Sequence, residues 1–544
     1  MDGRLFRIPE YQRAYSWQKH QREDLFGDIE KTDAKGEEVG HFMAAVVCLR
    51  RTKQALGTDE FHVMEVVDGQ QRLTTLIILL NAIKLALDCD NKGEAKLARE
   101  LAELLVKVEG DELLLLQTNH DSSHHFANFL RGGVAAEASL ATTLADREIL
   151  SAIEDCGDFV ANWKDRGKSL LTLAALLKNR LFFLLHEINE EKTVYTVFEV
   201  LNSRGLDVSW LDRLKSILMG SAFEIKGSNQ LGVIKDLHTA WRDIYSVIGL
   251  RQGLSTEALR FAATLKADEA PARPLGEEDS VDGLRHQATN AKGIRVVANW
   301  LHRVTVAADA VTADKRLNAV TRISQARLLA VAIQLRDDLK PEHRKRLLTR
   351  WEKVSFRIYG MLRNDARKRV GDYCRLAWRV VNEQLPVPVI ERELKVIGDE
   401  FSIDEAVESL RNDNCYEGWE VELRYMMYRY EEHLAKKQKL NFRNEQWERI
   451  WMVSPSESIE HIWAQSKATD KSRHRLGNLV VLPPKLNSAL QNKDAKEKVD
   501  AYRKTGLLIA CEVAGLIEQS KWNAKAIDDR EAALLEWAAE EWAD

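Results

Sequence analysis

The chain has few prolines and few cysteines for its length, and it has no long apolar run. Nine prolines among 544 residues, with 7% aromatic and 30% charged residues, favour long amphipathic helices over a β-sandwich. The six cysteines lie far apart without a CxxC pair, which argues against a disulfide framework or an all-cysteine zinc site. No stretch reaches roughly 18 uncharged apolar residues and no apolar leader opens the chain, so membrane spanning and secretion are disfavoured. We therefore predict a cytoplasmic protein.

The chain also lacks a strong charge of one sign. It has 79 Lys and Arg against 84 Asp and Glu, a formal net charge of −5, which excludes a uniformly basic nucleic-acid-binding coat and leaves only a local patch. The stretch from Arg344 to Arg379 is such a patch, with twelve Lys or Arg, three acids and interleaved aromatic residues. Two interpretations stay open for it: a contact surface for the phosphate backbone, with strongly salt-dependent binding, or a solvated helical face that acidic neighbours neutralise.

The apolar pattern predicts an α+β fold that is predominantly helical. Apolar runs at 42–49 and 61–67 predict strands, and the second run ends at a turn, Asp68-Gly69. A strongly apolar helix is expected over 73–87, and a further strand over 181–188.

Length alone suggests three or four folding units of about 150 residues each. Helical patterns continue to about residue 380, interrupted at 266–283 by an acidic, proline-containing linker or long loop. We predict three domains: an N-terminal domain over 1–225, a helical middle domain over 226–399 that carries the basic patch at 344–379, and a C-terminal domain over 400–544.

A constellation of polar residues near the carboxyl end carries the most chemistry. Glu460 and His461 stand at the end of a predicted strand. Asn478 opens a second predicted strand, and Pro484 begins a helix that carries Asn487. In this strand–loop–strand–helix order, Glu460, His461 and Asn487 are expected to converge. Carboxylate and amide oxygens suit Mg²⁺, and a histidine can take the proton from an attacking water. The set predicts metal-assisted phosphodiester hydrolysis, with Asn478 holding the loop that carries His461.

This pattern resembles the HNH, or ββα-metal, endonucleases. EHI, then GNL, then an asparagine nine residues on, together with LRYMMYRYEEHL at 423–434, is similar to the GmrD-like nuclease domain of GmrSD type IV restriction enzymes. The resemblance implies an HNH motif in a helical C-terminal domain, a Mg²⁺ or Mn²⁺ ion held by Glu460 and Asn487, and four catalytic residues: Glu460, His461, Asn478 and Asn487. The chain departs from the family pattern at Ala464, where the family has proline, and at Ala495, where it has an aromatic residue. Neither is a metal or base position.

Three histidine features near or outside this motif have plainer interpretations. A Glu-His pair is common on its own, and only its combination with GNL and the later asparagine argues for catalysis. His474 either touches a phosphate or caps the loop, and capping is favoured. The group of His120, His124 and His125 is expected to be a polar loop, since nothing nearby in the sequence completes a metal coordination set.

The N-terminal part carries a second polar constellation. Gln12 and Arg13 lie in the segment IPEYQR, and Asp68-Gly69-Gln70-Gln71-Arg72 spans the turn before the predicted helix. A glycine turn lets backbone N–H groups approach an anion, arginine offers forked donors to phosphate, and a helix N-terminus adds partial positive charge. No GxxxxGK[ST] motif occurs, so nucleotide chemistry here would not be of the P-loop kind. The alternative is that Gln70, Gln71 and Arg72 only cap and pair at a buried helix end.

These segments resemble the GmrS-like domain of the same family, whose core is similar to the ParB/sulfiredoxin fold. The match continues through VFEVLNSRGL at 197–206 to Lys215. The resemblance implies that this domain senses modified DNA and binds and hydrolyses a nucleoside triphosphate (NTP). The pocket residues that it implies are Gln12, Arg13, Asp68, Gly69, Gln70, Gln71, Arg72, Asn202 and Arg204. The family usually has a strand and a helix before its IPxYQR motif, whereas seven residues precede Ile8, so we expect either a start further upstream or a missing first element.

Together these resemblances predict an NTP-dependent and Mg²⁺-dependent DNA endonuclease of the type IV, modification-dependent kind, acting in anti-phage defence. Its expected partners are DNA, above all modified phage DNA, and an NTP, with no membrane; cutting of both strands would favour a homodimer. Two alternatives stay open. One is a ParB-like DNA-binding regulator that does not cut, and the other is an RNA nuclease or toxin without modification sensing.

Overall fold

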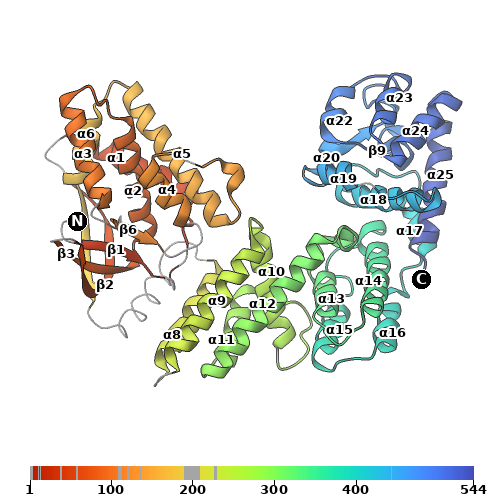
Figure 1. The fold of residues 1–544 in the computed structure, drawn as a ribbon. Coiled ribbons are helices and arrows are strands. Elements are labelled where there is room, and N and C mark those ends of the chain that lie inside the picture. The colour runs from red at the N-terminus through yellow and green to blue at the C-terminus, as the bar shows by residue number, and fades with distance from the viewer. Residues whose placement is uncertain are drawn as a thin grey trace. The chain divides into compact units, whose positions relative to one another are not determined.

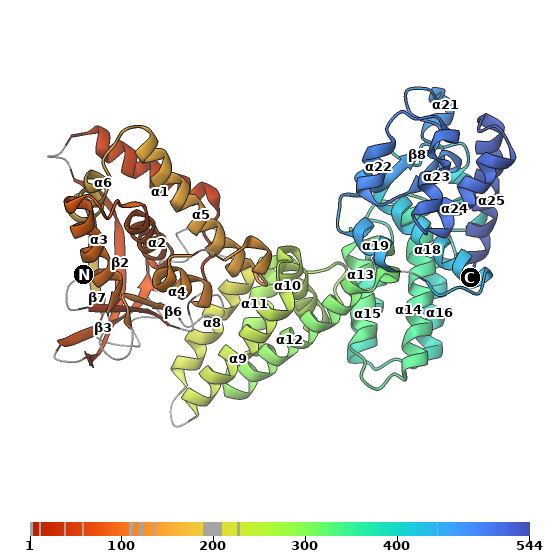
Figure 2. The same cartoon turned by 45° about the horizontal axis from the view of Figure 1, so that its top comes forward.

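The computed structural model describes residues 4–9, 12, 14–36, 40–56, 59–107, 113–118, 123–134, 136–188, 209–225, 229–442 and 444–544. The chain forms two compact units, one from residues 1–263 and 276–306 and the other from 264–275 and 307–544 (Figures 1 and 2). The fold class is α+β and predominantly helical, as predicted. The boundaries expected at 225 and 400 stay a prediction. Within the described ranges, no helix combines the length and the apolar character that crossing a bilayer requires.

The first unit combines helices with a five-stranded sheet and a separate pair of short strands, β4 and β5. The last residues of α10 and α12 belong to the second unit. The elements are β1 (Arg4–Ile8), α1 (Lys19–Ala34), β2 (His41–Leu56), β3 (Asp59–Asp68), α2 (Gln70–Ala86), α3 (Lys92–Leu105), β4 (Val106–Lys107), β5 (Leu113–Leu114), β6 (Leu116–Thr118), α4 (Ser123–Gly132), a short 3-10 helix η1 (Ala138–Leu140), α5 (Leu144–Asp165), α6 (Leu170–Asn179), β7 (Leu181–Ile188), α8 (Trp210–Glu224), α9 (Gln230–Ile248), α10 (Gln252–Lys266), α11 (Glu277–Gln287) and α12 (Ala291–Ala313).

The sheet of the first unit is mixed, with the strand order β6-β1-β3-β2-β7. β1 lies parallel to β3 and β6, β2 pairs antiparallel with β3, and β7 runs parallel to β2. The register places Val47 opposite Asp68, so the end of β3 is held against β2 just before the polar turn. The strands predicted at 42–49, 61–67 and 181–188 are confirmed, and β1 and β6 are additional strands.

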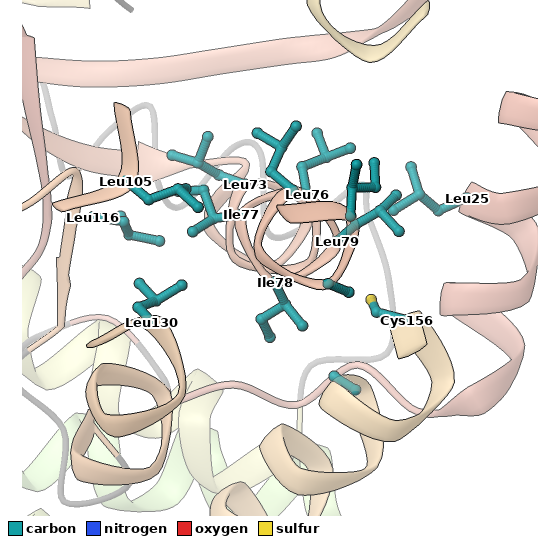
Figure 3. Close-up of a cluster of buried hydrophobic side chains, with 14 of the residues drawn as sticks. Leu25, Leu73, Leu76, Ile77, Ile78, Leu79, Leu105, Leu116, Leu130 and Cys156 are labelled. Atoms are coloured by element: carbon teal, nitrogen blue, oxygen red, sulfur yellow. The ribbon is translucent and has the colours of Figure 1, made fainter. Parts of the chain in front are cut away.

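Helix α2 is the centre of the core of this unit. Its residues from Leu73 to Ile83 are buried on every face, because it packs against α3, α4, α5 and α6. Figure 3 shows its side chains pointing towards Leu130 on one side and Cys156 on another. Gly69 starts the helix with a φ of 89°, and a Cβ atom there would meet Val46 Cγ2 at 3.1 Å. Only glycine takes this conformation and this close contact without strain.

The second unit is built almost entirely from helices. Its elements are η2 (Lys315–Val320), α13 (Ser324–Gln334), α14 (Pro341–Ser355), a π-helical turn η3 (Phe356–Met361), α15 (Val370–Asn382), α16 (Val387–Gly398), α17 (Ile403–Leu410), α18 (Glu420–Lys437), α19 (Asn444–Trp451), α20 (Pro455–Ser458), β8 (Ile459–His461), α21 (Asp470–Arg473), η4 (Leu476–Asn478), β9 (Leu479–Val481), α22 (Pro484–Leu490), α23 (Ala495–Lys504), α24 (Leu508–Gln519) and α25 (Ala524–Glu541).

A buried carboxylate joins three helices of this unit. Glu352 on α14 accepts hydrogen bonds from Tyr425 on α18 at 2.5 Å and from Trp542, directly after α25, at 2.8 Å. Arg429, one turn further along α18, pairs with Glu352 at 2.9 Å and also with Glu541. Removal of either buried charge would leave the other uncompensated. The network therefore fixes α18 and α25, the two helices that flank the C-terminal motifs in the sequence.

The basic stretch at 344–379 lies mostly on α14 and α15. Its aromatic residues Trp351 and Tyr373 are fully buried and belong to the core. Its arginines form ion pairs with nearby acids: Arg346–Glu391, Arg357–Asp544, Arg363–Asp413, Arg367–Asp365, Arg369–Glu400, Arg375–Asp372 and Arg379–Glu383. These contacts favour the neutralised helical face over the phosphate contact surface.

Replacing Ile78 with alanine should destabilise the first unit by about 2–5 kcal/mol, because it leaves a cavity in a core that α2 fills on every side. Ile78 is fully buried, whereas Leu85 on the same helix is 48% exposed, so Leu85→Ala is the control and should cost less than about 0.5 kcal/mol. Urea unfolding followed by tryptophan fluorescence measures both variants. Equal shifts of the unfolding midpoint would contradict the central place of α2.

Candidate functional site

The C-terminal motifs fold into two short antiparallel strands followed by a helix. β8 pairs with β9, with His461 opposite Leu479, and the Ile462 N–H donates to the Asn478 carbonyl at 2.9 Å. Pro484 stands in the first turn of α22, where its missing N–H costs nothing. The strand–loop–strand–helix order agrees with the prediction, except that Asn478 directly precedes β9 instead of opening it.

Asn478 holds the loop between the two strands closed. Its side chain is fully buried. Its Oδ1 accepts from the Trp463 N–H at 2.8 Å, and its Nδ2 donates to the carbonyls of Trp463 and Arg473 at 3.1 and 2.9 Å. An amide offers a donor and an acceptor together, which neither a carboxylate nor an apolar side chain does. One side chain therefore binds the backbone at both ends of the loop, close to His461 and His474.

Helix α25 packs directly against the residues on either side of Asn478. A Cβ atom on Gly477 would meet the backbone carbonyl oxygen of Ile527 at 2.0 Å, so no larger residue fits there. Arg530 on α25 donates to the carbonyls of Gly477 and Leu479 at 2.9 and 2.8 Å. The glycine of the Gly-Asn-Leu motif is thus a packing requirement of the loop against this helix.

His461 is buried and in contact at both ring nitrogens. Its Nε2 lies 3.0 Å from Nδ1 of His474, and its Nδ1 lies 3.1 Å from the side-chain nitrogen of Gln465. Tyr416 stands edge-on to the ring, with centroids 4.8 Å apart. Burial, together with the neighbouring His474 ring and the ammonium of Lys498, lowers the pKa of His461 to about 3. The residue is therefore neutral near pH 7, which is the form that accepts a proton.

Glu460 lies in the same strand but contacts different groups. The ammonium of Lys498 on α23 lies 2.6 Å from its Oε1, and the Tyr502 hydroxyl donates to the same oxygen at 3.4 Å. Lys498 is fully buried and also donates to the carbonyls of His461 and Ile462 at 2.7 and 3.3 Å. Burial raises the pKa of Glu460, and the nearby ammonium counteracts that shift. Glu460 and His461 are thus neighbours in one strand, but their side chains contact different residues and do not contact each other in the way that the sequence suggested.

Asn487 binds the backbone just before Glu460. Its Nδ2 donates to the carbonyls of Glu457 and Ile459 at 2.8 and 3.2 Å. Among the residues that the structure describes, no group of three or more His, Cys, Asp or Glu is placed to hold a metal ion. The oxygens of Glu460 and Asn487 nevertheless suit a hard divalent ion, since Mg²⁺ takes one or two protein oxygens and fills its other positions with water and substrate phosphate. Such an ion would have to share Glu460 with Lys498.

The N-terminal motifs meet at the start of α2. Gln12 Nε2 donates to the Val67 carbonyl at 2.7 Å, and Gln70 Nε2 donates to Gln12 Oε1 at 3.1 Å. Gln71 Oε1 accepts from the Ser16 N–H at 2.8 Å. These buried amides fasten the segment before α1 to the first turn of α2, so they pair at a buried helix end without capping the helix by a side-chain hydrogen bond.

Asp68 and Arg72 flank this amide network. Arg72 lies over the ring of Trp17, 5.7 Å from its centroid. Burial lowers the pKa of Arg72, and the charge of Asp68 opposes that effect. Lys215 on α8 donates to the Gln12 carbonyl at 3.4 Å, so α8 reaches the same place. The remaining predicted residues of this pocket, and one histidine of the polar group, lie outside the described part of the chain: Arg13, Asn202, Arg204 and His120.

Several residues at these sites were missed by the sequence analysis or undervalued by it: Tyr416, Gln465, His474, Lys498, Tyr502 and Lys215. Lys498 and Tyr502 come from α23, far along the chain from Glu460, and no local spacing links them to it. The available signal for Lys498 was its position three residues after Ala495, within the segment 492–498 that was compared with the family pattern. The available signal for His474 was its position three residues before Gly477.

Two family models match the chain. The model described as GmrSD restriction endonuclease, N-terminal domain, matches residues 1–219. The model described as GmrSD restriction endonucleases, C-terminal domain, matches residues 400–537. The first match contains the amide network at the start of α2, and the second contains β8, β9 and α22. No curated protein matches the chain.

Replacing Asn478 with alanine should open the loop between β8 and β9, with a loss of about 1–3 kcal/mol for each buried group left unpaired. Asn478→Asp should be nearly as harmful, because a carboxylate cannot donate to the two carbonyls. Asn441→Ala, at an exposed asparagine of the same unit, is the control. Thermal unfolding and limited proteolysis between residues 463 and 478 report the change, and wild-type behaviour of Asn478→Ala would contradict this role.

Proposed function

Because the chain belongs to the GmrSD restriction endonuclease family, and is therefore a DNA-cutting enzyme of the type IV restriction kind, we propose that it cuts at an HNH motif in its C-terminal part. We propose further that cutting depends on Mg²⁺ or Mn²⁺ and on an NTP, and that its target is modified phage DNA. The observation that carries the proposal is His461, a buried neutral histidine on a strand pair that is followed by a helix.

In this proposal His461 is the general base. It takes the proton from the water that attacks the scissile phosphorus, and the new P–O bond forms as the bond to the leaving sugar oxygen breaks. A divalent ion bound by the oxygens of Glu460 and Asn487 would polarise the phosphoryl group and stabilise the leaving oxyanion. Lys498 orients the strand through the carbonyls of His461 and Ile462, and Asn478 holds the loop.

The NTP is proposed to bind at the start of α2. The Gly69 turn precedes the first-turn N–H groups of the helix, which attract phosphate through their partial positive charge. Arg72 offers a forked donor to phosphate, and Lys215 places a second cation beside Gln12. The side-chain hydrogen bonds of Gln12, Gln70 and Gln71 hold the segment before α1 against the start of α2. In this proposal these glutamines therefore position the pocket and do not bind the nucleotide themselves.

The variant His461→Ala should lose DNA cutting by about 10²–10⁴-fold, because the general base is removed. Its DNA binding and thermal stability should stay close to those of the wild type. His433→Ala, at a partly buried histidine on α18 of the same unit, is the matched control. Cutting is measured on plain, glucosylated-hydroxymethylcytosine and phosphorothioate DNA, with Mg²⁺ or EDTA and with each NTP in turn. Normal cutting by His461→Ala would refute the HNH assignment.

The same assay, with RNA added as a further substrate, separates the alternatives. DNA binding without cutting under any condition would favour a ParB-like regulator. Cutting of RNA alone would favour an RNA nuclease or toxin.

The variant Arg72→Ala should abolish NTP hydrolysis, because the phosphate loses its forked donor, while the fold is kept. Arg99→Ala, at an exposed arginine on α3 of the same unit, is the control. Phosphate release from each of the four NTPs is the measurement. Unchanged turnover in Arg72→Ala would remove the pocket at the start of α2 from the proposal and leave the nuclease site untouched.

A further inference from the structure

We propose that His474 is a positioning residue for His461. It accepts the hydrogen of His461 Nε2 and thereby leaves Nδ1 as the atom that takes the proton from water. The inference rests on the proposed function, in which His461 is the base. It adds to that function a second histidine and a defined acceptor atom.

The contact with Gln465 favours one position for the hydrogen on the His461 ring. The side-chain nitrogen of Gln465 lies 3.1 Å from His461 Nδ1. An amide nitrogen only donates, so Nδ1 accepts with its lone pair. A neutral imidazole has one N–H group, and this orientation of Gln465 favours Nε2, which faces His474 Nδ1 at 3.0 Å. His474 Nδ1 is thus the acceptor of the second hydrogen bond.

The surroundings of His474 favour this arrangement. Tyr416 stacks on its ring with centroids 5.2 Å apart and an angle of 11° between the planes, and the Cys415 N–H donates to its carbonyl at 2.8 Å. Its Nε2 lies 3.9 Å from the carboxylate of Glu417, which favours a hydrogen on that nitrogen. Burial lowers the pKa of His474, so the ring stays neutral and Nδ1 keeps its lone pair.

The two partners of His461 differ in how easily a substrate replaces them. Gln465 is exposed, whereas the side chain of His474 is only 16% exposed and packed under Tyr416. A water molecule can take the place of the Gln465 amide at Nδ1 without opening the core. When Nδ1 is protonated, the Nε2 hydrogen remains bonded to His474, which supports the imidazolium. Without His474, Nε2 loses its partly buried acceptor, and only the exposed Gln465 opposes a hydrogen on Nδ1. An Nδ1 that carries a hydrogen has no lone pair with which to accept a proton from water.

The experiment uses two variants of the full chain. His474→Phe keeps an aromatic ring under Tyr416 but offers no acceptor, and His474→Asn places Oδ1 close to the position of Nδ1. Single-turnover cutting should fall by about 100-fold or more in His474→Phe and stay within about tenfold of the wild type in His474→Asn. DNA affinity should be unchanged in both.

A spectroscopic readout is independent of activity. Nitrogen NMR of the ¹⁵N-histidine-labelled protein should show His461 with its hydrogen on Nε2 in the wild type and in His474→Asn, and a mixture of tautomers in His474→Phe. His433→Asn is the control, because His433 stacks on Tyr430 at 5.9 Å and 11° in the same way and should change neither readout.

The outcomes separate this inference from the proposed function. Wild-type cutting by His474→Phe, while His461→Ala is inactive, would overturn the role of His474 and keep the HNH proposal. Equal loss in His474→Asn and His474→Phe would also overturn it, because His474 would then act as more than an acceptor. A wild-type His461 with its hydrogen on Nδ1 would overturn the assigned acceptor atom. Normal cutting by His461→Ala would refute the proposed function itself.

Discussion

The closure of the loop between β8 and β9 by one buried amide is the constraint on which the candidate nuclease site depends. Asn478 binds the backbone of Trp463 and Arg473, and these residues follow His461 and precede His474. The contact between the two imidazole rings is therefore set by a side chain that touches neither of them. Lys498 also helps to fix the position of His461, because it donates to the carbonyls of His461 and Ile462.

The two motif groups of this GmrSD family member share a way of building their scaffolds. At the start of α2 the supporting bonds are made by Gln12, Gln70 and Gln71, and at the C-terminal site by Asn478 and Asn487. Amides do not titrate, so these scaffolds keep their hydrogen bonds over a wide pH range. A change in the protonation of a neighbouring histidine or carboxylate therefore does not break the hydrogen bonds that these amides make.

Much of the fold could be predicted from the sequence, because its elements have strong local signals. The apolar runs that became β2, β3, α2 and β7 were predicted close to their observed positions, since alternation and long apolar stretches depend on neighbouring residues only. β1 and β6 were missed because they are short and because their pairings, β1 with β3 and β6 with β1, are not specified by the local sequence.

The site was less predictable, for a physical reason. Spacing indicated that Glu460 and His461 are functional, but the partners of each come from distant segments. Lys498 and Tyr502 reach Glu460 from α23, and Tyr416 reaches His461 from the loop before α18. The polarity of Gln70 and Gln71 suited a ligand as well as a helix end, and only their hydrogen bonds show that they fasten the segment before α1 to α2.

The close approach of Gly477 to the Ile527 carbonyl also bears on how the enzyme matures. Helix α25 is translated after both halves of the nuclease motif, yet its backbone forms the wall against which their connecting turn is pressed. While the polypeptide is still emerging from the ribosome, that wall is missing and the two histidines have no fixed spacing. The geometry of the motif is therefore completed only when α25 has been synthesised and packed against the turn.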